Sequence, residues 1–344
     1  NLEKLIQLSH QNKKGVISLC HMSSPEAKVT YELGVKLGSK QTQLYKLFLQ
    51  WATKMSTDGI IVGATFPDII KYCKKQSKGK LSVFSPGIGT QGGDISSTIS
   101  AGSDYLIVGR TILNAKDPKK TAQEMAEDDI KINMRMGKNG SILFDNNDTI
   151  MTHCNAGSLA TVAYGTALGV IRATKESGKN VKVIATETRP VQQGSRLTAF
   201  ELKHDGFDVS LIPDTAVGYS MANKLVNKVV VGADRVLRTG HVYNKIGTYQ
   251  VALMAKQHGI PFYVAAPLST FDMKSNPQDV IIEQRKGTEV TQIGDKKTAP
   301  DGINVINPAF DMTPPELISG IITEAGVAKP PFDVTIPKLF EANK

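Results

Sequence analysis

Cys154 stands at a place in the sequence where a cysteine can do chemistry. The run before it, 149–153, is typical of a buried strand, and a small polar turn separates it from a helical pattern that opens at Ser158. Parallel α/β sheets bind ligands at such strand-to-helix junctions. A thiol there faces the unpaired amides and positive end of the new helix, which lower its pKa. A lone cysteine is more commonly a small core residue, so position rather than residue type favours a catalytic role.

The elements around Cys154 predict an open, doubly wound, Rossmann-like parallel sheet over residues 141–333. Apolar runs separated by amphipathic stretches indicate alternating strands and helices. The expected strands are 149–153, 181–186, 209–213, 228–232 and 262–266, with helices at about 158–177, 195–205, 216–224 and 246–258. Asp214 and Asp234 also follow predicted strands, where such folds place their sites. Capping of the next helix is the alternative role for an aspartate there.

Residues 1–120 predict a different α/β arrangement. Expected strands at 16–20, 59–64, 81–85 and 105–110 alternate with helices, the first of them long and ending near Met55. Four such βα units amount to half of a (β/α)₈ barrel, which leaves two sheet edges unpaired. A helical joint is expected at 121–140. The proline-rich segment after Pro330, with the tail 334–344, is expected to be extended.

A glycine-rich loop, Gly87–Gly92, formally fits the dinucleotide pattern G-x-G-x-x-G. The helix after it is short, and Arg110 ends the next strand where a ribose-binding acid would stand. Loop amides and an arginine together favour a phosphate site instead. A tight turn that needs glycines is the structural alternative.

The motifs around this loop resemble the second half of archaeal-type orotidine 5′-phosphate decarboxylases, over about residues 1–120. They are Cys20–Pro25, Ser85–Asp94 and Ile107–Arg110. The resemblance implies that Ser23 contacts a pyrimidine and that the phosphate is held by Pro86, Gly87, Gln91, Gly109 and Arg110. The family's catalytic Asp-x-Lys-x-x-Asp pattern does not precede Val16, so we expect a phosphate grip without decarboxylation.

From about Ala126 to Phe332 the chain resembles the methylthioribose-1-phosphate isomerase family. The shared motifs are Thr152–Gly157, Glu187–Pro190, Gln193-Gly194, Gly232–Arg235, Asn244–Thr248 and Asn307–Asp311. The resemblance implies aldose–ketose isomerisation of a sugar 1-phosphate by Cys154 and Asp234. It also implies substrate binding by Gln193, Asn244 and Lys245, no cofactor or metal, and a homodimer.

The chemistry accounts for these residue types. An aldose–ketose conversion needs a proton handler at the sugar oxygens, and Asp234 in a site that excludes water would have a pKa raised enough for that role. Cys154 would help to stabilise the transition state, and proton transfer and hydride shift both remain open. Without the resemblance, Lys245 would be taken for a surface lysine. His153 points opposite to Cys154 along the strand and is expected in the core.

The family's amino-terminal Arg-Gly-Ala phosphate loop and a further arginine have no counterpart here. A natural fusion, a fragment or deletion product of a longer protein, and an artificial chimera all fit this pattern, and the first residue is Asn1 rather than Met. Three alternative functions stay open: a ribose-1,5-bisphosphate isomerase, a non-catalytic regulatory subunit of the initiation factor 2B type, and a decarboxylase fragment. The Asn155–Thr161 run favours the methylthioribose enzyme. The retained Cys154 and Asp234 argue against the regulatory subunit.

Composition and charge fit a cytoplasmic protein of 344 residues. No apolar run reaches the length of a membrane helix, no secretory signal is evident, and Cys20, Cys73 and Cys154 are too far apart for a disulfide framework. Residues 1–120 contain 17 Lys and Arg against 8 Asp and Glu, and the rest is balanced. The lysines are scattered, so a phosphorylated sugar or nucleotide is a better partner than nucleic acid.

Overall fold

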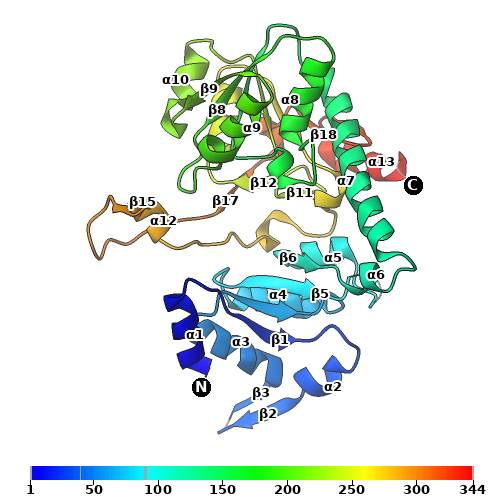
Figure 1. Ribbon diagram of the computed structural model, residues 1–344, viewed down its shortest axis with the longest axis vertical. Helices are drawn as coiled ribbons and strands as arrows, with labels where there is room; N and C mark the ends of the chain where they lie inside the picture. Colours follow the sequence, from blue (N-terminus) through cyan, green and yellow to red (C-terminus); the bar gives the residue numbers. More distant parts are fainter. Residues whose placement is uncertain (1, 39, 89–90, 343–344) are drawn as a thin grey trace. The chain divides into compact units, whose positions relative to one another are not determined.

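The computed structural model describes residues 2–38, 40–88 and 91–342. These residues divide into two compact units (Figure 1). The first unit runs to Ala122 and also takes in Gln278–Gln284. The second unit comprises Gln123–Pro277 and the residues from Arg285 onward. Each unit has its own hydrophobic core, so each is described by itself below.

In the described part of the first unit, four strands form one fully parallel sheet. The order is β1 (Ile17–His21), β4 (Gly59–Val62), β5 (Ser82–Pro86) and β6 (Tyr105–Ile107). The connecting segments hold α3 (Leu44–Lys54), α4 (Pro67–Gln76) and α5 (Ile95–Ser100). Ile60 and Val83 of the strands are fully buried with Ile70 of α4. The strand–helix alternation predicted for this unit is therefore present. Helix α1 (Leu2–Gln11) precedes the sheet and α6 (Arg110–Leu113) follows it.

The prediction of one long helix that ends near Met55 is wrong for the first half of that helix. A short helix, α2 (Ala27–Tyr31), is followed by a hairpin of β2 (Gly34–Leu37) and β3 (Lys40–Gln43), and only then does α3 begin. Gly38 takes a positive φ of 61° in the hairpin turn. Two glycines within this stretch lower its helix propensity, and the side-chain pattern alone did not reveal the turn.

The second unit is built on a sheet of seven strands among the described residues. Their order is β19-β18-β13-β10-β7-β8-β9, and every neighbouring pair is parallel except β18 with β19. The strands are β7 (Thr149–Thr152), β8 (Lys182–Thr186), β9 (Asp208–Ile212), β10 (Lys228–Val231), β13 (Phe262–Ala265), β18 (Gly320–Thr323) and β19 (Gly326–Ala328). The expected strands 149–153, 181–186, 209–213, 228–232 and 262–266 are thus confirmed to within a residue at either end.

Helices cover both faces of this sheet (Figure 1). One core cluster joins the sheet to α7 (Pro118–Ser141), α8 (Ala167–Glu176) and α9 (Ala199–His204). The other joins it to α10 (Val217–Ala222), α11 (Thr248–Gln257) and α13 (Phe332–Ala342). Val230 belongs to the first cluster and its neighbours Val229 and Val231 to the second, as the alternation of side chains along a strand requires. The sheet is therefore doubly wound.

Two helix predictions in this unit are wrong. The helix expected from Ser158 is only a 3₁₀ turn there, η1 (Ser158–Ala160), and α8 begins at Ala167 because Gly165 breaks the helix with a φ of +84°. The segment after Pro330 is the helix α13 rather than an extended tail. Phe332 and Ile336 of α13 are buried in the core, and this burial stabilises a helix that also contains Pro337.

A second, smaller sheet lies beyond the main one in the chain. Its order is β14 (Phe271–Asp272), β11 (Arg235–Leu237), β12 (Val242–Lys245) and β17 (Phe310–Thr313). Strands β11 and β12 form a hairpin directly after β10, and β12 pairs antiparallel with β17. The sequence patterns did not predict this sheet. Short elements complete the unit: η3 (Asp214–Ala216), η4 (Leu268–Thr270), α12 (Thr288–Thr291), β15 (Gln292–Ile293), β16 (Lys296–Lys297) and η6 (Pro315–Leu317). The 3₁₀ turn η5 (Pro277–Asp279) lies where the chain passes from this unit into the first.

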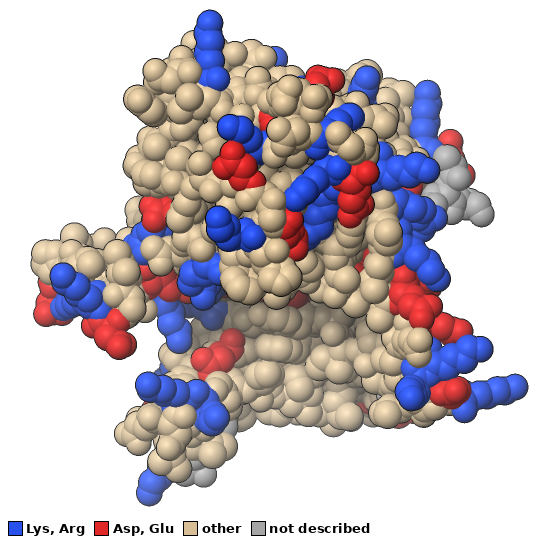
Figure 2. Space-filling view, turned by 45° about the horizontal axis from the view of Figure 1, so that its top comes forward, with Lys and Arg blue, Asp and Glu red and all other residues tan. Residues whose placement is uncertain are grey.

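Within the residues described, no helix is long and apolar enough to cross a membrane. On the face drawn in Figure 2, Lys and Arg side chains are interspersed with Asp and Glu side chains and do not form one continuous stripe. This distribution is that of a solvated surface of mixed charge rather than of an extended basic groove.

Candidate active site

The topology of the second unit places Cys154 and Asp234 at neighbouring strand ends. Counted along the chain, its six parallel strands lie in the order 3-2-1-4-5-6, and β7 and β10 are the first and fourth. These two strands are paired in the centre of the sheet. Chain order reverses between them, and doubly wound sheets bind their ligands at this switch point. Cys154 follows β7 and Asp234 follows β10, so the predicted pair lies there.

The backbone of Cys154 is held in a conformation that few non-glycine residues adopt. Its φ is +65°, and a left-handed conformation costs a non-glycine residue about 1–3 kcal/mol unless its surroundings enforce it. The amide of Cys154 donates to Thr188 Oγ1 at 2.9 Å, and Thr198 Oγ1 donates to the carbonyl oxygen of Cys154 at 2.5 Å. Two threonines from different segments therefore fix the residue that carries the thiol.

The pKa of Cys154 moves in the opposite direction from the sequence prediction. Burial is the main cause that raises the pKa of the thiol to about 11, with a contribution from the charge of Asp234, and the Asn155 amide and Lys245 offset this rise only in part. The predicted lowering assumed a helix starting at Ser158, whereas α8 begins at Ala167. Desolvation therefore dominates. The neutral thiol, and not the thiolate, is the form at neutral pH.

Asp234 approaches the thiol from the loop between β10 and β11. Its amide donates to the carbonyl of Tyr243 at 2.9 Å, which ties the loop to strand β12. Its carboxylate is close enough to raise the pKa of Cys154. The residue itself is exposed, so the water-excluding environment expected around this carboxylate is not present in this structure.

Asn244 and Lys245 reach the same region from β12 and are only 5% and 6% exposed. The ammonium of Lys245 donates to the carbonyl of Ala309 at 3.0 Å and lies 4.6 Å from the ring centroid of Phe310. Asn244 donates to Thr248 Oγ1 at 3.0 Å. Lys245 is therefore not a surface lysine. The charge of this buried ammonium acts to lower the pKa of the Cys154 thiol.

Gln193 precedes a single π-helical turn, η2 (Gly194–Thr198), of the kind often found at functional sites. Its Oε1 atom is buried and has no hydrogen-bond partner among the described residues. A buried acceptor without a partner is costly. Gln193 thus offers an open acceptor for a ligand hydroxyl.

His153 is a core residue, as its position in the strand predicts. Its side chain is buried, Nδ1 lies 2.6 Å from Thr186 Oγ1, and Nε2 lies 2.9 Å from the carbonyl oxygen of Ile246. Burial lowers the pKa of His153. Both ring nitrogens are occupied, so the histidine links β7 to the loop that follows Lys245.

The first unit brings together part of the predicted phosphate site. Ser23 Oγ donates to Gln91 Oε1 at 2.7 Å. Gly87 follows Pro86 at the end of β5 with a φ of +97°, and a Cβ there would stand 2.6 Å from the Ser23 side chain. Gly109 immediately precedes α6, which begins with Arg110. Gly89, Thr90 and the side chain of Arg110 lie outside the described part of the structure, so the role expected of Arg110 stays a prediction.

Comparisons with known proteins address both parts of the chain. Residues 109–330 match the model of the initiation factor 2 subunit family. The chain belongs to this family. Residues 1–125 match the model of the orotidine 5′-phosphate decarboxylase / HUMPS family. The isomerase and decarboxylase resemblances of the sequence are thereby confirmed at the level of families.

Individual members of the family agree with this. A methylthioribose-1-phosphate isomerase of Thermosipho africanus is 57% identical over 224 residues, which are 65% of either chain. One from Nitratidesulfovibrio vulgaris is 56% identical over 220 residues, covering 64% of this chain and 63% of its own. The chain thus spans slightly less than two thirds of the length of these relatives.

Two solved structures are similar to the chain. The δ subunit of translation initiation factor eIF-2B from A. fulgidus is 41% identical with a TM-score of 0.66, covering 80% of this chain and 78% of its own. The 5-methylthioribose 1-phosphate isomerase of Pyrococcus horikoshii is 34% identical with a TM-score of 0.65, covering 88% and 90%. The α/β fold with parallel sheets is therefore shared with both kinds of family member.

Sequence reasoning gave no role to Asp311, which contacts the loop that follows Lys245. Its carboxylate accepts from the amides of Gly247 at 2.7 Å and Tyr249 at 3.1 Å, at the start of α11. Asp311 also pairs with Asn244 in the β12–β17 ladder. The motif Asn307–Asp311 contained the available signal, but the pairing with β12 is not visible from sequence.

Proposed function

We propose that this chain is an aldose–ketose isomerase that converts S-methyl-5-thioribose 1-phosphate to S-methyl-5-thioribulose 1-phosphate. The observation that carries the proposal is the convergence of Cys154, Asp234 and Lys245 at the switch point of the sheet. Relatives named as methylthioribose-1-phosphate isomerases are 56–57% identical across this region. Similarity over about two thirds of those relatives supports the activity.

The reaction moves one hydrogen from C2 to C1 and a proton from the C2 hydroxyl to the ring oxygen, which is released as a hydroxyl when the ring C1–O bond breaks. The C1 oxygen keeps its phosphate throughout, and no oxidant or reductant is consumed. Asp234 is assigned the role of the general acid–base group that exchanges protons with the sugar oxygens. The neutral thiol of Cys154 provides a weak donor and a desolvated wall beside the reacting carbons. Lys245 offsets negative charge on the substrate, and Gln193 and Asn244 orient its hydroxyls. Both proton transfer and hydride shift fit these roles.

Two substitutions test the assignment. Cys154→Ser and Asp234→Asn should each lower kcat for methylthioribose 1-phosphate by about 10²–10⁴-fold, the usual contribution of a group acting on the transition state. Asp208→Asn is the matched control because Asp208 lies on the surface, 3.4 Å from the ammonium of Lys182, and is remote from the site in the sheet order. Near-parental turnover in either site variant would show that the mechanism is wrong.

The same assay separates the alternative functions. Ribose 1,5-bisphosphate in place of methylthioribose 1-phosphate tests the related isomerase. The similarity to the eIF-2B δ subunit supports a non-catalytic regulatory role. Turnover of neither sugar phosphate, in protein whose fold is confirmed by circular dichroism, would favour that role over the isomerase.

For the first unit we propose half of a (β/α)₈ barrel with a phosphate-binding end. Leu19, Ile61, Phe84 and Tyr105 form one row across the sheet by strand register. Leu19 and Tyr105 of this row are exposed, whereas Ile60 and Val83 on the opposite face are fully buried. An apolar but poorly covered face is expected of the inner surface of an incomplete barrel, because side chains fill a closed one.

Binding and turnover test this unit separately. Inorganic phosphate and orotidine 5′-phosphate should bind in a calorimetric titration, and Gln91→Ala should weaken both because Gln91 pairs with Ser23. Release of carbon dioxide from orotidine 5′-phosphate is not expected, since the family's Asp-x-Lys-x-x-Asp pattern is not found before Val16. Carbon dioxide release above background would contradict the proposal, and so would the absence of any phosphate binding.

We further propose that the chain forms a homodimer, as the resemblance to the isomerase family implies. Light scattering coupled to size exclusion should give twice the chain mass of 37.2 kDa. A monomer across the accessible concentration range would contradict this.

A further inference from the structure

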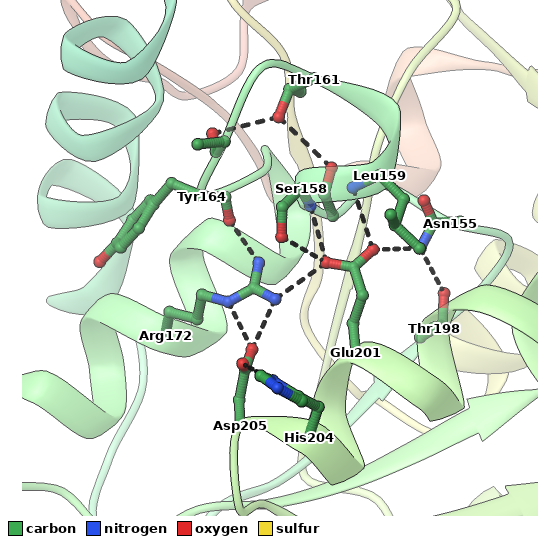
Figure 3. A network of polar contacts seen from close by, with 12 residues as sticks. Asn155, Ser158, Leu159, Thr161, Tyr164, Arg172, Thr198, Glu201, His204 and Asp205 are labelled. Carbon is green, nitrogen blue, oxygen red and sulfur yellow. Dashed lines mark hydrogen bonds and ion pairs between the residues drawn. The ribbon is translucent and has the colours of Figure 1, made fainter.

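A buried carboxylate on α9, that of Glu201, forms hydrogen bonds with the loop that follows Cys154 (Figure 3). Glu201 is 5% exposed. Its oxygens accept from the amide of Ser158 at 2.7 Å, the hydroxyl of Ser158 at 2.7 Å and the amide of Leu159 at 3.3 Å. The side-chain amide of Asn155 also donates to it at 2.9 Å. One side chain thus binds three residues of the loop, more than 40 positions away in sequence.

This contact leads back to Cys154 through a second hydrogen-bonded path. Asn155 Nδ2 also donates to Thr198 Oγ1 at 3.2 Å, and that hydroxyl is the one that binds the Cys154 carbonyl. Gly157 lies against the carboxylate so closely that a Cβ would stand 2.4 Å from either oxygen. The left-handed backbone of Cys154 is therefore enforced by a loop that is packed directly on Glu201.

Glu201 is itself fixed from the other side by Arg172. The guanidinium contacts Glu201 at 2.9 Å and Asp205 at 2.6 Å, and it also donates to the carbonyl of Tyr164. Burial alone would raise the pKa of Glu201, but the hydrogen bonds from Asn155, Ser158 and Arg172 outweigh it and the pKa is lowered. The carboxylate is thus ionised at neutral pH, as its four loop donors require.

We propose that Glu201 is a positioning residue for Cys154, holding the 154–159 loop in the conformation that sets the thiol beside Asp234 and Lys245. Among the described residues no contact between Glu201 and the thiol is present, so the proposed effect on Cys154 passes through Asn155, Ser158 and Thr198. The effect of Glu201 on turnover rests on the proposed isomerase function. Its effect on the reactivity of the Cys154 thiol does not depend on that function.

Asp205 provides the matched control. It shares Arg172 with Glu201, yet no hydrogen bond from the 154–159 loop to Asp205 is present among the described residues. Glu201→Gln keeps the shape of the side chain but removes its negative charge and one hydrogen-bond acceptor. Asp205→Asn removes the other negative charge that is paired with Arg172. Ser158→Ala deletes a single loop contact and serves where Glu201→Gln folds poorly.

Two readouts follow for each variant. The first is the rate at which iodoacetamide alkylates Cys154 from pH 7 to 10, followed by mass spectrometry of the Cys154 peptide. In the parent this rate should be low, because burial raises the pKa of the thiol. In Glu201→Gln it should rise about tenfold at pH 8, the effect of roughly one pKa unit, because a loosened loop exposes the thiol. In Ser158→Ala the alkylation rate should rise by less, and in Asp205→Asn it should match that of the parent.

The second readout is turnover of methylthioribose 1-phosphate. Glu201→Gln should lower kcat by about 10²-fold, the cost of a reacting group misplaced by an ångström, with a smaller change in KM. Parent-like alkylation in both Glu201→Gln and Ser158→Ala would overturn the proposal, and so would equal effects in Asp205→Asn. If the parent shows no isomerase activity, the alkylation series still decides the positioning role, so its failure and that of the proposed function are distinguishable.

Discussion

Asp311 is a carboxylate whose protonation is set by its place between β17 and the start of α11. Burial raises its pKa to about 6, although the amides of Gly247 and Tyr249 and the charge of Lys245 act in the opposite direction. The same residue holds the loop that follows Lys245, so its charge acts on both the stability and the shape of the site.

We predict that Asp311 makes unfolding depend on pH. A carboxyl with a raised pKa keeps in the native state a proton that the unfolded chain releases, so its contribution to stability is full below about pH 4 and is lost as the pH rises through 6. Relative to Asp311→Asn, the parent should lose on the order of 3 kcal/mol of unfolding free energy between pH 4 and 7. Urea titrations at each pH measure this.

The control for this series is Asp208→Asn, which removes an exposed carboxylate and should follow the parent at every pH. A flat difference between the parent and Asp311→Asn across this range would show that Asp311 does not titrate near pH 6.

At the scale of elements, one glycine decides how β8 meets the π-helical turn after Gln193. A Cβ on Gly194 would stand 1.7 Å from the carbonyl oxygen of Thr186. That oxygen belongs to the end of a strand paired on both sides, so neither partner can move freely. The close approach sets the position of Gln193 relative to the thiol-bearing loop.

We therefore predict that Gly194→Ala is strongly destabilising, by about 1–3 kcal/mol as for an overpacked core site, and that it lowers substrate affinity. Gly218→Ala is the matched control, because the nearest atom to its added Cβ is the Met254 sulfur at 3.4 Å and it lies within helix α10. That control should be neutral or gain up to about 1 kcal/mol in stability from lower backbone entropy. Thermal unfolding of both variants provides the comparison, and equal stabilities would refute the steric argument.

Elements with strong apolar runs were predictable from sequence, and those defined by pairing were not. Strands β8, β10 and β13 each contain at least three consecutive apolar residues, and β7 contains two, which is why their positions agree with the prediction. Strand β12 owes its existence to its partners β11 and β17. Helix α13 was missed because the proline-rich segment after Pro330 suggested an extended chain, whereas burial of Phe332 and Ile336 stabilises the helix.

The candidate site likewise has a part that could be predicted from sequence and a part that could not. Strand ends and motifs were enough to predict Cys154, Asp234, Asn244 and Lys245 as one constellation, and the topology places the two strand ends side by side. The direction of the pKa shift of Cys154 could not be predicted, because it depends on desolvation by residues distant in sequence. The contribution of Glu201 was hidden for the same reason, since no spacing rule links 201 to 155 and 158.

At the scale of the whole molecule, the residues proposed to carry catalysis are present, but part of the phosphate-binding motif implied by the family resemblance is not matched. The Arg-Gly-Ala loop and its companion arginine implied by the family resemblance have no counterpart in this sequence. Charge-assisted hydrogen bonds are worth about 1.5–3 kcal/mol each. Two missing contacts thus correspond to a loss of about 10²–10⁴-fold in affinity or rate.

We predict that a protein of these 344 residues is a weak isomerase, with kcat and KM both affected because the phosphate also positions the sugar. The isomerase of Thermosipho africanus, assayed in parallel, is the reference. A kcat/KM of about 10⁴ M⁻¹s⁻¹ or more, within the ordinary enzyme range, would show that phosphate binding has been rebuilt by other residues.

The burial of Phe332 and Ile336 in the main core has a consequence for synthesis on the ribosome. The core of the first unit is drawn from residues 20–101, so its residues are synthesised before those of the second unit. The sheet of the second unit needs β18 and β19 at its edge and α13 against its face, all beyond residue 319. At about 5–20 residues per second, tens of seconds separate the two events. During that interval the nascent strands β7 to β13 lack β18, β19 and α13, so apolar side chains and an unpaired strand edge are exposed, which favours aggregation.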